Sequence, residues 1–107
     1  MEIANLKENG VLLIIPEGRI DTTTASDFQT KAIELSADEM KVALDFSKVN
    51  YISSAGLRSV LVLAKEMNKK KGDFKIYAMN DSIKDIFDMA GFSSIINIVK
   101  TKEEVIN

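Results

Sequence analysis

Two adjacent serines, Ser53 and Ser54, are the side chains whose type and position most clearly offer chemistry in this sequence. They lie between an apolar run at residues 42–46 and an apolar stretch at residues 57–67, a pattern that predicts a buried strand followed by a helix. The first turn of a helix presents unpaired backbone N–H groups and the positive end of the helix dipole. A serine there can cap the helix, or it can carry a covalently attached anion. The residues alone leave both interpretations open.

The absence of histidine and cysteine excludes much catalytic chemistry. A Ser-His-Asp triad and a cysteine nucleophile are impossible within this chain, and the usual ligands of zinc are missing. The five glycines are too dispersed for a phosphate-binding loop. An enzyme that used Ser54 as nucleophile would need Lys65 or Lys69 as its base from farther along the helix, which disfavours that alternative. We therefore expect no enzyme activity, no cofactor and no metal site.

Length and composition predict one ordinary globular domain over residues 1–107. The chain is 46% hydrophobic and 28% charged, with a formal net charge of -2, so the basic face that nucleic-acid binding usually needs is not expected. No apolar run approaches the ~20 residues of a membrane span, and the first residues do not form a signal peptide. Together with the lack of disulfides, these features favour a cytoplasmic protein without membrane insertion.

Hydrophobic periodicity predicts nine elements in the order β-β-α-β-α-β-α-β-α. The dipeptide Asn9-Gly10 predicts a tight hairpin between the first two strands. The expected fold is therefore α/β, with a mixed sheet, an N-terminal hairpin and about four helices. The expected strands are residues 2–8, 11–15, 41–46, 74–78 and 95–99, and the expected helices are residues 25–35, 54–70, 83–90 and 101–106.

Three local features of these elements give further expectations. Pro16 comes late in the second strand, where a missing N–H is tolerated only at an edge or a bulge, so it weakens the pairing expected there. Gly72 is placed to end the long helix as its C-cap. The core-facing stripe of that helix is expected at Leu57, Val60, Leu61 and Ala64, and Val62 and Leu63 widen it.

Residues 44–57, which read LDFSKVNYISSAGL, resemble the signature of STAS domains, and in particular of the single-domain bacterial anti-sigma factor antagonists. Two more segments are similar to that family. Gly18-Arg19-Ile20-Asp21 is similar to its Gly-x-Leu-Asp before the first helix, and residues 83–92 are similar to its late helix. The resemblance covers nearly the whole chain and implies the same order of elements.

The resemblance implies a binding module that is switched by phosphorylation. The unmodified protein would bind an anti-sigma factor, typically a protein-serine kinase, and so free a sigma factor. The kinase would phosphorylate Ser54, and a PP2C-type phosphatase would reverse the modification. Ser53 holds a position that is often Asp in the family, so the identity of the modified serine stays open between the two.

The family motif also implies the residues that meet the partner. Ala55 and Gly56 would let the backbone of the partner approach closely, and Asp21 is the neighbouring acid expected at the interface. Thr22, Ser53 and Arg58 complete the expected contact set with Ser54. By residue type alone, Asp21 is equally a turn residue with a cap-like side chain. We expect a monomer or a weak dimer.

Two other functions remain open at this point. STAS domains also occur as regulatory parts of anion transporters and in stress-signalling assemblies, and such a regulatory subunit is the second hypothesis. A carrier protein with a serine-linked arm is disfavoured, because the Asp-Ser-Leu context of such carriers is absent.

Overall fold

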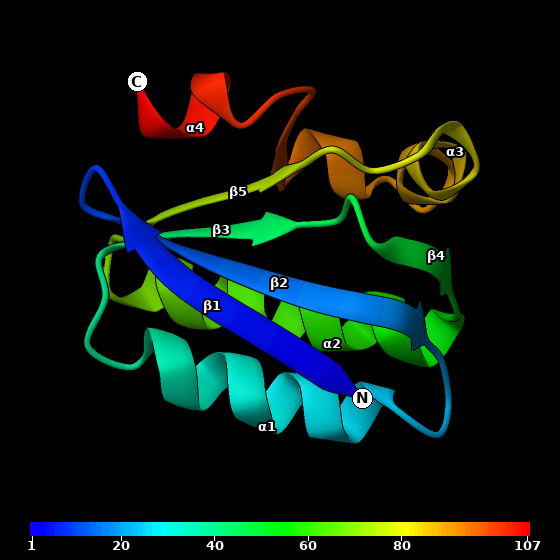
Figure 1. Cartoon of the computed structure of the whole chain (residues 1–107). Helices are drawn as coiled ribbons and strands as arrows, with labels where there is room; N and C mark the ends of the chain where they lie inside the picture. Colours follow the sequence, from blue (N-terminus) through cyan, green and yellow to red (C-terminus); the bar gives the residue numbers. More distant parts are fainter.

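The computed structural model describes residues 1–107, which form six strands, four α-helices and one short 3-10 turn. The expected fold class is confirmed: the chain forms an α/β domain with a mixed sheet and four α-helices (Figure 1). The strands are β1 (Glu2–Glu8), β2 (Val11–Ile20), β3 (Lys41–Asp45), β4 (Val49–Ile52), β5 (Asp73–Tyr77) and β6 (Asn97–Val99). The helices are α1 (Ala25–Ser36), α2 (Ser54–Lys69), α3 (Asp81–Met89), the 3-10 turn η1 (Phe92–Ser94) and α4 (Glu103–Ile106).

The sheet has the order β1-β2-β3-β5-β6, and only the hairpin pair β1–β2 is antiparallel. Asn9 and Gly10 connect the hairpin with φ angles of 51° and 81°. These left-handed values match a two-residue turn of the kind that Asn-Gly favours, because glycine has no Cβ to clash and asparagine tolerates the region. The hairpin expected from the sequence is therefore confirmed, and β3 lies in the middle of the sheet.

The structure contains one strand, β4, that was not expected from the sequence. It pairs in parallel with the second half of β2, whereas β3 pairs with the first half, from Leu12 to Ile14. The change of partner is accompanied by a register shift between Gly18 and Arg19. Gly18 has a φ of 102° and donates its N–H to the carbonyl oxygen of Lys48 at 2.9 Å. That conformation strains any residue with a side chain, which explains a glycine at this point.

Pro16 lies inside β2 at a point where the strand has no partner on one side, so the edge-like environment expected for it is present locally. β2 continues through it to Ile20, and Pro16 is opposite Ile3 of β1. On the other side of β2, pairing with β3 ends at Ile14 and pairing with β4 begins at Gly18. Pro16 falls in this gap between two partner strands, where no ladder hydrogen bond needs its N–H.

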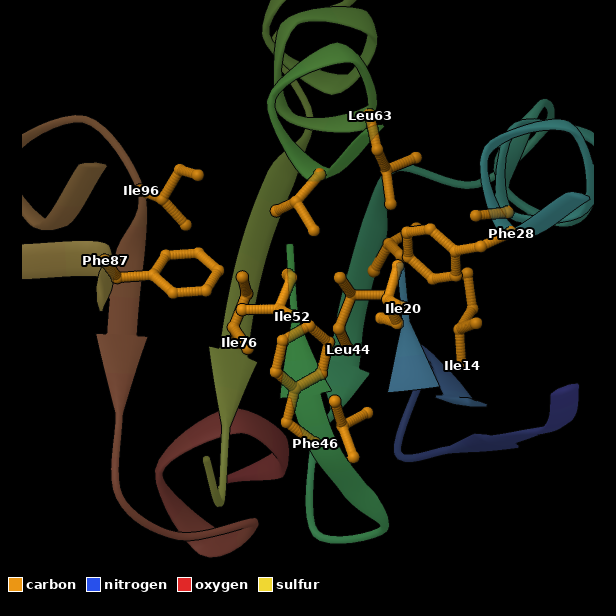
Figure 2. Close-up of a cluster of buried hydrophobic side chains, with 14 of the residues drawn as sticks. Ile14, Ile20, Phe28, Leu44, Phe46, Ile52, Leu63, Ile76, Phe87 and Ile96 are labelled. Atoms are coloured by element: carbon orange, nitrogen blue, oxygen red, sulfur yellow. The ribbon is translucent and has the colours of Figure 1, made fainter. Parts of the chain in front are cut away.

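The sheet is covered unequally on its two faces. α1 and α2 lie together on one face, and α4 lies on the other (Figure 1). The larger core fills the first interface: Phe28 from α1 and Leu63 from α2 point toward the strand residues Ile14, Leu44 and Ile76 (Figure 2). A second, smaller cluster lies under α4 and consists of Val11, Leu13, Ala43, Tyr77 and Val105.

The long helix α2 differs from expectation in which side chains it buries. Its buried positions are Gly56, Ser59, Val60, Leu63 and Met67, while Leu57, Leu61 and Ala64 are only partly buried. Val60 and Leu63 of the expected band are confirmed as core residues, and the buried stripe is rotated toward Leu63 and away from Leu57 and Leu61. A broadly apolar helix has no unique core face in its sequence, and packing against α1 and the sheet selects one.

The end of α2 is also not capped as expected. Lys71, and not Gly72, takes the left-handed conformation, with a φ of 60°. The N–H groups of Lys71 and Gly72 donate to the carbonyl oxygens of Asn68 and Met67, which is the hydrogen-bond pattern of a Schellman motif. Gly72 is instead closely packed, since a Cβ there would lie 2.7 Å from the flexible end of Met67, at Cε, and 3.1 Å from the Met40 carbonyl oxygen. No helix of the fold combines the length and the apolar character that crossing a membrane would require.

Candidate functional site

The parallel pair β2–β4 brings the two candidate segments together. Ile20 and Ile52 are register partners at the ends of these strands, and the N–H of Ser53 donates to the carbonyl oxygen of Ile20 at 2.9 Å. Asp21 follows Ile20 directly, and α2 begins at Ser54. The proximity of Asp21 to the two serines therefore results from the pairing of β2 with β4, a strand that was not expected from the sequence.

The two serines have different structural roles. Ser53 is the N-cap of α2, and its Oγ accepts a hydrogen bond from the N–H of Gly56 at 3.1 Å. Ser53 is only partly exposed, and its backbone is extended, as an N-cap requires. Ser54 is the first residue of the helix and is exposed, and its hydroxyl group has no hydrogen-bond partner within the chain. The capping role thus falls to Ser53, and Ser54 offers a free hydroxyl group at the positive end of the helix dipole.

Gly56 does not face a partner, which corrects the role expected for it. It is buried, and a Cβ at this position would lie 2.4 Å from the Ile20 carbonyl oxygen and 2.7 Å from Cγ1 of Ile52. The glycine therefore lets α2 approach the ends of β2 and β4. Because Gly56 has no side chain, the helix that carries Ser54 can pack closely against the sheet. The position at which a partner backbone was expected to approach Gly56 is buried inside the fold.

Asp21 organises the turn between β2 and α1. Its Oδ1 accepts hydrogen bonds from the N–H and the Oγ1 of Thr23, at 3.0 and 2.8 Å. These hydrogen bonds, chiefly the one from the Thr23 hydroxyl group, lower the pKa of Asp21 to about 2. The N–H of Asp21 donates to Oγ1 of Thr24, whose hydroxyl group donates in turn to the Arg19 carbonyl oxygen at 2.7 Å. Asp21 is therefore ionised at neutral pH, and its side chain has the cap-like contacts of a turn residue.

Arg19 and Tyr51 belong to the same surface, and the sequence analysis did not select them as site residues. The guanidinium carbon of Arg19 lies 4.2 Å from the centre of the Tyr51 ring, in cation–π geometry. Arg19 Nε lies 3.4 Å from Oδ2 of Asp21. In the sequence, the available signals were the aromatic residue Tyr51, two positions before Ser53, and Arg19, two positions before Asp21. Strand register was needed to bring the two side chains together.

The remaining expected residues lie around Ser54 with different exposure. Thr22 is exposed in the turn after Asp21. Ala55 is half-buried in the first turn of α2. Arg58 is exposed one turn farther along the helix, and none of the ion pairs of the chain includes it.

The site residues lie on the surface at the start of α2 and in the turn after β2. The chain has no group of three or more carboxylate, histidine or cysteine side chains that could hold a metal ion. A hollow of about 550 Å³ lies along the C-terminal half of α2 and is lined by residues such as Leu61, Phe74 and Ile96. None of the expected site residues lines it. The arrangement around Ser54 suits a protein contact that a covalent anion could alter.

Comparison with known proteins identifies the family. The family model described as STAS domain matches residues 2–105. BtrV of Bordetella bronchiseptica, whose name gives anti-sigma factor antagonist as a provisional role, is 29% identical over 104 residues, covering 96% of this chain and 90% of BtrV. An anti-sigma factor antagonist from Mycobacterium paratuberculosis has a similar structure, with a TM-score of 0.89 and 19% identity over 97% of this chain and 89% of that one. The Bacillus cell fate determinant SpoIIAA in its phosphorylated form has a TM-score of 0.72 and 16% identity over 98% of this chain and 96% of that one. Because the family model spans almost the entire sequence and the observed fold agrees with these structures, the chain belongs to the STAS domain family.

Proposed function

We propose that this protein is an anti-sigma factor antagonist that is switched by phosphorylation of Ser54. The unmodified form binds an anti-sigma factor that is also a protein-serine kinase, and the bound anti-sigma factor releases its sigma factor. The kinase phosphorylates Ser54 and thereby ends the interaction, and a PP2C-type phosphatase restores the active form. The protein itself is a ligand and a substrate, with no catalysis of its own.

The observation that carries this proposal is that only one of the two serines caps α2, while the other has a free hydroxyl group. Ser53 uses its side-chain oxygen to cap α2, whereas the Ser54 hydroxyl group is exposed and free. A kinase needs an accessible hydroxyl group, and only Ser54 combines access with a position before Gly56 and Leu57 that matches the family motif. The name of BtrV supports the role of anti-sigma factor antagonist, and the phosphorylated form of SpoIIAA supports regulation by phosphorylation.

Electrostatics explain how the modification changes binding without unfolding the domain. A phosphate adds about −1.5 to −2 charges at neutral pH. At the first residue of a helix an anion gains roughly 0.3–1 kcal/mol from the dipole, so the modified domain is no less stable. A partner that fits a small hydroxyl group must now accommodate a dianion close to ionised Asp21, and like charges at an interface cost several kcal/mol. Since each ~1.4 kcal/mol is tenfold in affinity, a loss of about 100-fold or more is expected.

The experiment measures the affinity of the kinase for charge variants by calorimetry. Ser54→Asp should bind much more weakly than wild type, while Ser54→Ala should bind and should resist release by ATP. Ser82→Asp is the matched control, because Ser82 is an exposed serine in the first turn of a different helix, α3. It adds the same charge at a helix N-terminus and should leave binding unchanged. Equal affinity of Ser54→Asp and wild type, or phosphate mapped to Ser53 after incubation with kinase and ATP, would reject the proposal.

A further inference from the structure

We propose that Arg58 forms an ion pair with the phosphate on Ser54, and that this pair withdraws the guanidinium group from the partner. The inference rests on the proposed phosphorylation of Ser54 and assigns a second half to the switch. Phosphorylation would then act twice: it adds a negative charge at the centre of the surface, and it neutralises a positive charge that the unmodified surface presents.

The position of Arg58 on α2 supports the pairing. It follows Ser54 by one helical turn, the spacing at which side chains on a helix are neighbours, with about 5–6 Å between Cβ atoms. Helical side chains lean toward the N-terminus, so the side chain of Arg58 leans toward the turn that carries Ser54. The order of an anion before a cation at this spacing is also the favourable one relative to the helix dipole.

Arg58 is the free cation at this end of the molecule. Arg19 also lies beside the serines, but its guanidinium group is stacked on the ring of Tyr51 and paired with Asp21. Arg58 is exposed and takes part in no ion pair. A phosphate on Ser54 can therefore recruit Arg58 without breaking an existing contact, and the planar guanidinium group can donate two hydrogen bonds to phosphate oxygens.

The same freedom defines what Arg58 does before modification. An exposed arginine one turn from the contact residue is available to an acidic group on the partner, and interfaces favour arginine for such contacts. Once Ser54 is phosphorylated, the phosphate is held next to Arg58 at high effective concentration and competes with the acidic group of the partner for the guanidinium group. The partner then loses this contact as well as meeting the dianion.

The test of the pair uses protein in which phosphoserine is installed at position 54 during translation, so that no kinase is needed. Phosphorus NMR follows the second ionisation of the phosphate in wild type, Arg58→Ala, Arg58→Lys and Lys65→Ala. A neighbouring cation stabilises the dianion, so the phosphate pKa, ordinarily about 6, should be roughly 0.3 to 0.6 of a pH unit lower in wild type than in Arg58→Ala. Arg58→Lys should fall between them, because it keeps the charge and loses the paired donors. Lys65→Ala is the control, since Lys65 is an exposed cation farther along the same helix.

Calorimetry with the kinase then tests the withdrawal of the guanidinium group. The ratio of the affinities of unmodified and phosphorylated protein should be at least threefold smaller in Arg58→Ala than in wild type, because the variant has no arginine contact to lose. An identical phosphate pKa in wild type and Arg58→Ala, or an equal rise of the phosphate pKa in Lys65→Ala, would overturn the ion pair. An identical affinity ratio would overturn the withdrawal. Binding that phosphorylation leaves unchanged in wild type would refute the proposed switch itself, and the phosphorus titration would still decide whether the pair forms.

Discussion

Replacing Gly56 by alanine tests the packing role that the structure gives to this residue. The new Cβ would lie 2.4 Å from the Ile20 carbonyl oxygen, 2.7 Å from Cγ1 of Ile52 and 3.0 Å from Cγ2 of Ile20. The Ile20 carbonyl oxygen cannot move aside at low cost, because it accepts the hydrogen bond from the Ser53 N–H at 2.9 Å. The substitution must therefore push the start of α2 away from the ends of β2 and β4.

The magnitude follows from two opposing effects. Over-packing an interior position costs about 1–3 kcal/mol, and the upper end applies here because the contacted atom belongs to the backbone. Alanine is about 1 kcal/mol better than glycine inside a helix, which offsets part of that cost. We expect a net loss of about 2 kcal/mol in the free energy of unfolding. For a domain of this size each kcal/mol lowers the Tm by about 4–8 °C, so the expected decrease is roughly 8–16 °C.

The assay is thermal and denaturant unfolding followed by circular dichroism, with Gly72→Ala as the matched control. A Cβ at Gly72 meets first the flexible end of Met67, at 2.7 Å, so this glycine should be replaced with a smaller loss of stability. Kinase binding by Gly56→Ala, corrected for the folded fraction, reports separately on the surface. An unchanged or higher Tm for Gly56→Ala, combined with lost binding, would refute the packing argument and restore the contact with a partner backbone that the sequence suggested.

Three further predictions concern the turn after β2 and the end of α2. Asp21→Asn should weaken kinase binding because it removes the negative charge, but it should lower the Tm by only a few degrees because it keeps an oxygen that can accept from Thr23. Asp21→Ala removes this acceptor and should lower the Tm further. Equal Tm losses for the two variants would show that the negative charge itself stabilises the turn. Because folding lowers the pKa of Asp21 to about 2, the ionised side chain stabilises the fold above its ordinary pKa of 3.8, and this stabilisation is lost as the pH falls toward 2. In this pH range the Tm of wild type should therefore decrease more steeply than the Tm of Asp21→Asn. NMR of the side-chain carboxyl should show the low pKa directly. Lys71→Gly should raise the free energy of unfolding by about 0.5–1 kcal/mol in urea titrations, because glycine adopts the left-handed conformation without strain, and Lys70→Gly, at a residue with a negative φ, should lower it.

Local signals in the sequence were sufficient for most of the elements. The Asn9-Gly10 turn, the buried strand before the serines and the broad apolar helix after them depend on residues that are close in sequence. Their positions in the structure agree with expectation to within a few residues. The family motif at residues 44–57 likewise predicted the fold class, because the order of elements largely determines which sheets can form.

The tertiary structure decided what depends on pairing between distant segments. β4 is only four residues long and has no periodicity of its own, so its existence becomes evident only where it pairs with the second half of β2. That pairing explains why Pro16 is tolerated in a central strand and why Gly56 must lack a side chain. It also decides that Ser53 caps the helix while Ser54 stays free, since the hydrogen bond from the Ser53 N–H to Ile20 fixes where α2 begins. The sequence by itself determined that two serines stand at a strand-to-helix junction, and only the contact between β2 and β4 determined which of them faces solvent.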